Sequence, residues 1–564
     1  MNLSKGDFIK TVKSPDLWAV IYVAAMIIPN ILLDITEQMS VWGKIANILV
    51  PASIYLLLVS KVKRTGAIIL WLVIMMVMNA FQIVLYYLYG ESIIAIDMLI
   101  NCVTSNPEEA GELLSNLTLP IVINCIIYIP IILWAIYAST RKPALRSSLK
   151  FRARAFRVGI IGLASGIIFT VIATACGGGY TVARSLYPFN VISNIGTAIH
   201  RIYQSANYDK TSAGFSYDAT LNDSIPQPEI MVLVIGETSR VGNWEIFGYD
   251  RPTNPRLSQR NDLIKFSKAV SQSNTTHKCV PLMLSPIDPA QFDSINYYKN
   301  IISAFNEAGF NTSFYSNQAK NHSYTQFFSE AAQKLDYLDA DHRFDHYLVD
   351  EMSRDLADTT RTNQFIVLHT YGSHFNYHDR YTDDFSFFKP DGSTNANAKH
   401  RKVLVNAYDN SIRYIDNYLD DAIRQLEATG KSAVLIFSAD HGEDIFDDDR
   451  QRFLHASPVA TYWQLHVPMF IWMSDSYRAS HPDIVNALQS NSDRLMAPSQ
   501  SIFHTIIDMA GIDTRYFNPA NSVASDRFES PVPVFLNDYN EAVPLQLSGL
   551  KQRDIEEFKK INVL

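Results

Sequence analysis

The chain has 564 residues, of which 48% are hydrophobic and 18% are charged, and its formal net charge at pH 7 is −8. This length predicts two or more domains, and the negative charge argues against a nucleic-acid partner. The four cysteines exclude a disulfide framework after residue 183, because Cys279 is the only cysteine in that region.

Five apolar runs occupy the first third of the chain, and each is close to the ~20 residues that a membrane helix requires. They cover residues 17–33, 45–60, 66–89, 118–138 and 158–175. The second run is short enough for a buried helix of a soluble protein, but the set as a whole favours membrane spans. The sequence therefore predicts an α-helical membrane domain of five transmembrane helices over residues 1–183.

The basic residues of this region are unevenly distributed. They precede the first run, follow the second and lie between the fourth and fifth, whereas none occurs between Arg64 and Arg141. By the positive-inside rule, the N-terminus is cytoplasmic, residues 34–44 and 90–117 are external loops, and everything after residue 184 is external. Because four spans follow the first run, we do not expect it to be a cleaved signal peptide.

A connecting segment over residues 184–228 follows the last span. Residues 184–204 carry apolar side chains at helical spacing, which predicts a helix lying on the membrane surface or an ordinary packed helix. Residues 205–228 are rich in Ser, Asn, Asp and Pro and predict a linker. The soluble domain is then expected over residues 229–564.

Short apolar runs alternate with amphipathic stretches in the soluble part, which is typical of an α/β domain with a mostly parallel central sheet. Uniformly apolar runs indicate strands that are buried on both faces. Between the second and third runs, apolar residues at spacings of three and four over residues 412–426 predict a connecting helix. The runs lie at residues 230–235, 364–369, 433–437 and 467–472.

Acidic residues follow two of these predicted strands. The first run is followed by Glu237, and the third by Asp440, His441, Glu443 and Asp444. Because ligands collect beyond the carboxyl ends of parallel strands, we expect these groups to meet at one edge of the sheet. They form a credible divalent-metal site whose ligands favour zinc or manganese over magnesium. Any one of these acids alone is more typical of a solvated residue that caps the next helix.

Two adjacent threonines, Thr275 and Thr276, lie in the segment NTTHKCVPLMLS at residues 274–285. A threonine hydroxyl is a poor nucleophile at neutral pH unless a partner activates it. A nearby metal ion lowers the pKa of a hydroxyl group and so provides this activation without a general base. Thr276 is therefore a candidate fourth metal ligand and a candidate nucleophile.

Four segments carry a resemblance to a known family. The chain resembles the lipopolysaccharide phosphoethanolamine transferases of Gram-negative bacteria, which belong to the alkaline-phosphatase and sulfatase superfamily. The resemblance extends over the five apolar runs, the linker and the soluble part. It implies an α/β/α alkaline-phosphatase-like catalytic domain in the periplasm, attached to a multi-pass domain in the bacterial inner membrane. The segments are GETSRVGNWEIFGYDRPTNP, NTTHKCVPLMLS, HTYGSHFNYHDRY and SADHGEDIFDDDRQRFLHASP.

The resemblance also implies a zinc site and a covalent intermediate. In the family, a threonine five residues before a proline becomes phosphoethanolaminated, and Pro281 at this spacing selects Thr276 over Thr275. The implied ligands of one Zn²⁺ ion are Glu237, Thr276, Asp440 and His441. A second metal ion is possible.

Further residues match family positions for substrate. His374 and His455 match histidines that bind the phosphate or a second metal, and Lys320 lies near the position of a lysine that approaches the phosphate. Asn101, Ser105 and Glu109 recur every four residues, so a helix would place them on one face, and they resemble a family set that receives the ethanolamine headgroup. The alternative for these three is a solvated loop face.

Two features depart from the family pattern. Serine replaces threonine at position 105, and the disulfides of better-known members are absent, which leaves Cys279 unpaired. We therefore expect the soluble domain to be stabilised by packing alone.

The implied reaction transfers phosphoethanolamine from phosphatidylethanolamine to lipid A or to the lipopolysaccharide core. The added ammonium group would lower the negative charge of the surface and weaken the binding of cationic peptides such as polymyxin. Three alternatives remain open: a sulfatase or phosphodiesterase that passes the intermediate to water, a glycerol-phosphate transferase that uses phosphatidylglycerol, and a catalytically silent membrane sensor.

Overall fold

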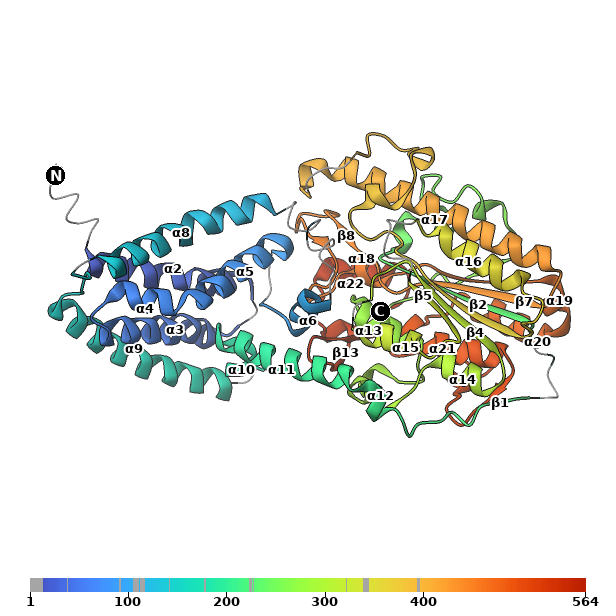
Figure 1. Ribbon diagram of the computed structural model, residues 1–564, viewed down its shortest axis with the longest axis horizontal. Coiled ribbons are helices and arrows are strands. Elements are labelled where there is room, and N and C mark those ends of the chain that lie inside the picture. The colour runs from blue at the N-terminus through green and yellow to red at the C-terminus, as the bar shows by residue number, and fades with distance from the viewer. Residues whose placement is uncertain are drawn as a thin grey trace. The chain divides into compact units, whose positions relative to one another are not determined.

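The computed structural model describes residues 14–37, 39–90, 93–104, 111, 117–141, 143–176, 179–222, 226, 228–320, 322–337, 344–392 and 396–564 (Figure 1). The chain divides into two compact units. One comprises Met1–Leu99 and Leu113–Ile199, and the other comprises Ile100–Glu112 and His200–Leu564.

The first unit is a bundle of apolar helices. Within the described residues, four helices are long and apolar enough to cross a membrane: α2 (Pro15–Thr36), α3 (Val41–Lys61), α8 (Thr118–Thr140) and α9 (Leu149–Ala175). A fifth crossing is formed if α4 (Thr65–Trp71) and α5 (Val73–Tyr89) count as one span, although they are bent by 57°. The predicted apolar helical region is thus confirmed, and the fifth of the five predicted spans is present only as this bent pair.

Small residues allow close packing of α9 against α3. A Cβ atom added at Gly162 would lie 2.3 Å from the hydroxyl of Ser53, and one added at Gly166 would lie 2.7 Å from a methyl group of Val50. Glycine is therefore needed at these positions for the two backbones to approach, which is the usual way in which membrane helices pack.

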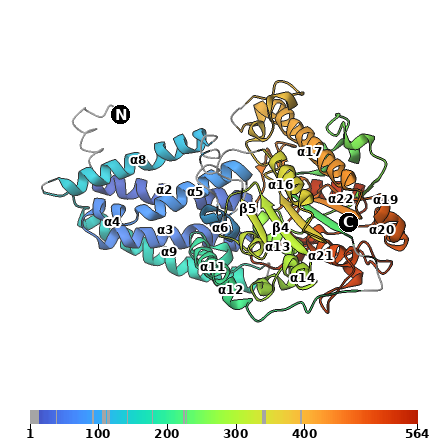
Figure 2. The same ribbon diagram turned by 45° about the vertical axis from the view of Figure 1, so that its right-hand side comes forward.

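The second unit is built around a seven-stranded sheet in the order β3-β10-β7-β2-β6-β4-β5 (Figures 1 and 2). Five adjacent strands are parallel, β10 pairs antiparallel with β7 at one edge of this group, and β3 pairs antiparallel with β10. The predicted, mostly parallel sheet is confirmed. The strands are β2 (Ile230–Gly236), β3 (Leu263–Lys265), β4 (Asn311–Ser316), β5 (Lys334–Tyr337), β6 (Gln364–His369), β7 (Ala433–Ala439) and β10 (Met469–Met473).

Helices cover both faces of this sheet, as Figure 1 shows. Alternate residues of β2 enter two different cores: Met231 belongs to one, whereas Ile230 and Val232 belong to the other. This alternation explains why the run is apolar throughout, because both faces of the strand are buried. Helices α16 (His346–Ala357) and α17 (Arg401–Thr429) cover one face, and α13 (Thr276–Met283), α14 (Ile301–Glu307) and α21 (Pro498–Met509) cover the other.

Further α-helices and strands occur besides those named above. The remaining helices are α6 (Ile96–Thr104), α10 (Val182–Ser185), α11 (Phe189–Ala206), α12 (Tyr208–Thr211), α15 (Tyr324–Ser329), α18 (Tyr462–Leu465), α19 (Asp475–Ser480), α20 (Pro482–Asn491) and α22 (Gln552–Lys560). Three strand pairs lie outside the main sheet: β1 (Thr220–Leu221) with β11 (Ile512–Asp513), β8 (Asp444–Ile445) with β9 (Phe453–Leu454), and β12 (Val534–Leu536) with β13 (Ala542–Pro544).

A buried histidine beside β10 predicts a loss of stability in acid. His466 Nε2 lies 2.9 Å from the carbonyl oxygen of Ser267, and Nδ1 lies 2.7 Å from the hydroxyl of Tyr462. Burial lowers the pKa of His466 from 6.5 to about 4. Because the folded-state pKa is depressed, this contribution to stability is complete above pH 6.5 and is lost as the pH falls towards 4. We expect the melting temperature of the detergent-purified protein to fall over this range.

Replacing the histidine should remove part of this pH dependence. In His466→Gln the melting temperature should fall less steeply between pH 6.5 and 4 than in the wild type, whereas the exposed His200→Gln should follow the wild-type curve. Parallel curves for wild type and His466→Gln would show that His466 does not contribute.

Candidate active site and metal centre

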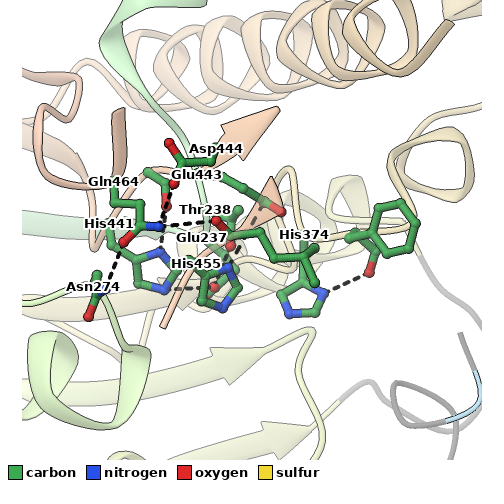
Figure 3. Close-up of polar contacts among 12 residues, drawn as sticks. Glu237, Thr238, Asn274, His374, His441, Glu443, Asp444, His455 and Gln464 are labelled. Atoms are coloured by element: carbon green, nitrogen blue, oxygen red, sulfur yellow. Dashed lines mark hydrogen bonds and ion pairs between the residues drawn. The ribbon is translucent and has the colours of Figure 1, made fainter. Parts of the chain in front are cut away.

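Three adjacent strands place the candidate residues at the carboxyl edge of the sheet. Glu237 follows β2, the pair Asp440 and His441 follows β7, and His374 lies in the loop after β6. Thr276 is the first residue of α13. Figure 3 shows Glu237 and His441 close together, with His374 nearby.

The Thr276 hydroxyl lies between a carboxylate and an imidazole. Its oxygen is 3.2 and 3.1 Å from the two carboxylate oxygens of Glu237 and 3.2 Å from Nε2 of His441. Thr275 instead lies with its hydroxyl 3.3 Å from that of Ser273. The structure therefore brings Thr276, and not Thr275, to the acids and histidine that follow the strands.

The histidines form a group beside the Glu237 carboxylate. The ring of His455 lies 4.3 Å from the ring of His441 and 5.7 Å from that of His374, measured between centroids. His441 Nδ1 is 3.0 Å from the carbonyl oxygen of Gly442, to which it donates. This bond leaves Nε2 as the nitrogen that faces Glu237, at 3.3 Å from a carboxylate oxygen.

Burial and neighbouring charges shift the protonation of this group. Burial opposes ionisation of Glu237, but His441, and then His374 and His455, hold the pKa of Glu237 well below 4.5. Burial together with the charge of Glu237 raises the pKa of Asp440 to about 7. Burial raises the pKa of Glu443 well above its usual value, although Tyr377 opposes this shift. The site thus contains several buried carboxyl groups, and the pKa values of two of them, Asp440 and Glu443, are raised.

The residues fit a divalent cation. Asp440 is fully buried, yet its Oδ2 atom accepts no hydrogen bond from any described residue and lies 3.4 Å from His441 Nε2. Ligand atoms of Glu237, His441 and His455 all lie within 4.8 Å of one another. Carboxylate oxygens and imidazole nitrogens are suitable ligands for zinc. Asp440, His441, Glu237 and the Thr276 hydroxyl would hold such an ion, with His455 beside them.

A glycine is required where the loop after β6 meets β2. Gly372 has φ +58°, and a Cβ atom there would lie 2.4 Å from the carbonyl oxygen of Glu237. We expect Gly372→Ala to lower the free energy of unfolding by about 1–3 kcal/mol. Urea unfolding of the purified protein measures this. Gly214→Ala is a matched control, because no atom lies within 4 Å of a Cβ at Gly214, and an equal loss in both variants would contradict the expectation.

Of the remaining sequence candidates, the structure describes Lys320 and Asn101. Lys320 is exposed, and its ammonium nitrogen lies 5.4 Å from the ring centroid of Tyr337. Asn101 is half-buried in α6. Ser105 and Glu109 lie outside the described residues.

Two contacts to Glu237 were not found from the sequence. Thr238 donates its hydroxyl to Glu237 Oε1 at 2.7 Å, and Gln318 donates its amide to Glu237 Oε2 at 2.9 Å. Thr238 is part of the quoted motif GETSR and was therefore within reach of sequence reasoning. Gln318 follows β4, which was not predicted as a strand.

Comparison with known proteins places this fold and site in a family. The family model described as Sulfatase matches residues 229–512. This match covers half of the chain and includes Glu237, Thr276, Asp440 and His441. The chain belongs to the Sulfatase family, within the alkaline-phosphatase and sulfatase superfamily.

Individual proteins of known annotation are also similar to this chain. A Kdo(2)-lipid A phosphoethanolamine 7''-transferase of Escherichia coli (strain K12) is 31% identical over 318 residues, which are 53% of this chain and 54% of the relative. The chain thus spans about half the length of the curated relatives it matches.

Solved structures extend the fold comparison to the membrane region. The integral membrane protein lipooligosaccharide phosphoethanolamine transferase A (EptA) from Neisseria meningitidis aligns with a TM-score of 0.70 and 20% identity, over 92% of this chain and 99% of that one. The C-terminal periplasmic domain of EcEptC from Escherichia coli, solved in complex with Zn, aligns with a TM-score of 0.53 and 23% identity, over 59% of this chain and 98% of that one. At these identities the likeness shows the fold alone. The apolar helices of the chain and this likeness in fold together indicate a multi-pass membrane protein with a soluble C-terminal domain.

Proposed function

We propose that the protein transfers phosphoethanolamine from phosphatidylethanolamine to lipid A or to the lipopolysaccharide core, through a covalent intermediate on Thr276. The observation that carries the proposal is the position of the Thr276 hydroxyl, 3.1 Å from Glu237 and 3.2 Å from His441. The name of the Escherichia coli relative, a Kdo(2)-lipid A phosphoethanolamine transferase, supports the substrate class.

The reaction consists of two displacements at phosphorus. In the first, Thr276 Oγ forms a bond to the phosphorus of phosphatidylethanolamine, and the bond from phosphorus to the diacylglycerol oxygen breaks. In the second, an oxygen of the acceptor forms a bond to the same phosphorus and Thr276 Oγ leaves. The diacylglycerol oxygen takes up the proton that Thr276 loses in the first displacement, and Thr276 regains a proton from the acceptor hydroxyl in the second, so that diacylglycerol and the acceptor carrying phosphoethanolamine are the products.

We infer that Glu237, Thr276, Asp440 and His441 bind one Zn²⁺ ion. Support comes from the buried Asp440 oxygen that accepts no hydrogen bond from any described residue, and from the zinc complex of the EcEptC domain. When bound, the ion supplies positive charge that lowers the pKa of the Thr276 hydroxyl. Glu237, to which this hydroxyl is hydrogen-bonded, orients it towards the substrate.

His374 and His455 are assigned to the phosphoryl group or to a second metal ion. Negative charge builds on the phosphoryl oxygens in both displacements, and the imidazole groups of His374 and His455 beside His441 would stabilise it electrostatically. His374 Nδ1 is 2.8 Å from the carbonyl oxygen of Phe375, to which it donates, so Nε2 remains for a ligand. Lys320 is assigned to the phosphate, and Asn101, Ser105 and Glu109 to the ethanolamine headgroup, on the resemblance alone.

We further propose that residues 1–183 lie in the bacterial inner membrane and that residues 229–564 form the catalytic domain in the periplasm. Residues 184–228 would connect them through an interfacial helix. Helix α11 supports this, because Ile192, Ile199 and Tyr203 are all exposed, at 50, 62 and 67%, which gives the helix an apolar face for lipid headgroups and acyl chains. Added phosphoethanolamine would lower the negative surface charge and weaken polymyxin binding.

The family match leaves the hydrolytic alternative open, since a sulfatase or phosphodiesterase would pass the intermediate to water. Full-length protein in detergent, supplied with lipid A and, in parallel reactions, with phosphatidylethanolamine or phosphatidylglycerol, distinguishes the candidates. We expect diacylglycerol and phosphoethanolamine-modified lipid A in equal amounts. Free phosphoethanolamine with unmodified lipid A would indicate a hydrolase. Turnover of phosphatidylglycerol alone would indicate a glycerol-phosphate transferase, and the absence of any reaction would indicate a sensor.

A further inference from the structure

Both oxygens of the Glu237 carboxylate are held by uncharged donors. The hydroxyl of Thr238 donates to Oε1 at 2.7 Å, as Figure 3 shows, and the amide of Gln318 donates to Oε2 at 2.9 Å. The Thr276 hydroxyl lies almost equally far from the two oxygens, at 3.2 and 3.1 Å. The two donors therefore fix the carboxylate while it faces the candidate nucleophile.

Gln318 is itself held by a second bond from the same nitrogen. Its Nε2 also donates to the carbonyl oxygen of Thr370, at 2.9 Å. Glu237 follows β2 and Thr370 follows the neighbouring strand β6. The two hydrogens of one amide group thus join the ends of two strands, and rotation of the side chain would break both bonds.

The backbone around Gln318 is anchored as well. The preceding residue, Asn317, donates its backbone N–H to His369 at 2.9 Å and its side-chain amide to Asp345 at 2.7 Å. The buried Asp345 carboxylate also accepts the backbone N–H groups of residues 371 and 372, at 2.8 and 2.9 Å. The position of Gln318 is therefore set by the ends of β4 and β6 together.

An amide suits a position beside a metal ligand. It donates a hydrogen bond without adding charge, so Glu237 keeps its full negative charge for a cation. A lysine or arginine at the same place would neutralise Glu237 and compete with the ion. A glutamate there would repel the Glu237 carboxylate. Hydrogen bonds from outside the ligand set are known to tune metal affinity by orienting the ligands.

We propose that Gln318 is a positioning residue for the metal site, because it holds the Glu237 carboxylate in the orientation that binds the cation. The inference rests on the proposed function only in that Glu237 is taken as a zinc ligand. It does not require that lipid A is the acceptor.

The test measures zinc binding by full-length protein in detergent, through competition with a chromophoric chelator. Gln318→Met preserves the length of the side chain and removes the amide, and it should weaken zinc binding by about 10- to 100-fold. The melting temperature of the metal-free protein should stay close to that of the wild type. Gln333→Met, the same change at the residue before β5, should leave zinc affinity unchanged.

Gln318→Asn is a second variant that keeps the amide but shortens it, so that it reaches only one of its two acceptors. Its zinc affinity should fall between those of the wild type and Gln318→Met. If Gln318→Met does not fold, the zinc affinity of Gln318→Asn tests the positioning role instead. Wild-type affinity in the folded variants would overturn the positioning role. Failure of the wild type to bind zinc would overturn the metal assignment itself, whereas zinc binding without phosphoethanolamine transfer would overturn only the proposed reaction.

Discussion

Thr276→Ala is expected to reduce phosphoethanolamine transfer by at least ~10³-fold, because it removes the oxygen that forms the bond to phosphorus. Thr276→Ser should retain measurable transfer, since serine keeps a hydroxyl at the position that faces Glu237 and His441. Release of diacylglycerol from phosphatidylethanolamine, followed with and without lipid A, measures both displacements. Loss of diacylglycerol release in Thr276→Ala would place the defect in the first displacement.

Thr275→Ala is the matched control for this substitution. Thr275 precedes α13 and makes no side-chain hydrogen bond to the first turn of the helix, so its loss should change transfer by only a few-fold. If Thr275→Ala abolished the reaction and Thr276→Ala did not, the nucleophile would be Thr275 and the assignment of Thr276 would be wrong.

Glu237→Gln is expected to weaken zinc binding by more than about 100-fold and to abolish transfer. The change preserves the shape of the side chain but removes the negative charge that a divalent cation requires. It also places an amide group beside the donors Thr238 and Gln318, so at least one of the bonds at 2.7 and 2.9 Å is lost or reversed in direction. Zinc content after dialysis, followed by transfer assays with added zinc, measures both effects.

The exposed Glu556→Gln in α22 controls for the loss of one acidic group and should retain its zinc. A chelator should inactivate the wild type, and zinc should restore its activity but not that of Glu237→Gln. Full activity of Glu237→Gln after chelator treatment would show that transfer does not depend on this carboxylate.

The sequence predicts those elements whose residues are uniformly apolar. Strand β2 is buried at every position, so its apolar run defines both the strand and the position of Glu237 at its end. Strand β4 is also buried almost throughout, but it contains Thr312, Ser313 and Ser316, so no apolar run marks it. Because β4 was not predicted, Gln318 could not be placed near Glu237.

Two other elements differ from what the sequence predicts. Helix α17 begins at Arg401, well before the predicted residue 412, because its first turns bury polar side chains such as Asn406 and Asp409, which have no apolar periodicity. The third apolar run is bent by 57° between α4 and α5, although no proline or glycine occurs at the break. Cys279 is free, as predicted, and is buried in the core.

The prediction of the candidate site rests partly on the positions of residues after the predicted strands and partly on the resemblance to the family. The ends of parallel strands predict that Glu237 and the pair Asp440 and His441 meet, and these three side chains lie together in the structure. The choice of Thr276 over Thr275 came from the resemblance, because neither threonine follows a predicted strand. A hydrogen bond across residues far apart in sequence, such as that of Gln318, leaves no local pattern from which it can be inferred.

The most direct measurement is the intact mass of the purified protein after incubation with phosphatidylethanolamine in the absence of an acceptor. We expect the wild type to gain the mass of one phosphoethanolamine group, located on Thr276 by peptide mapping, and to lose it when lipid A is added. An unchanged mass during continued release of diacylglycerol, or a modified residue other than Thr276, would contradict a covalent intermediate on this threonine.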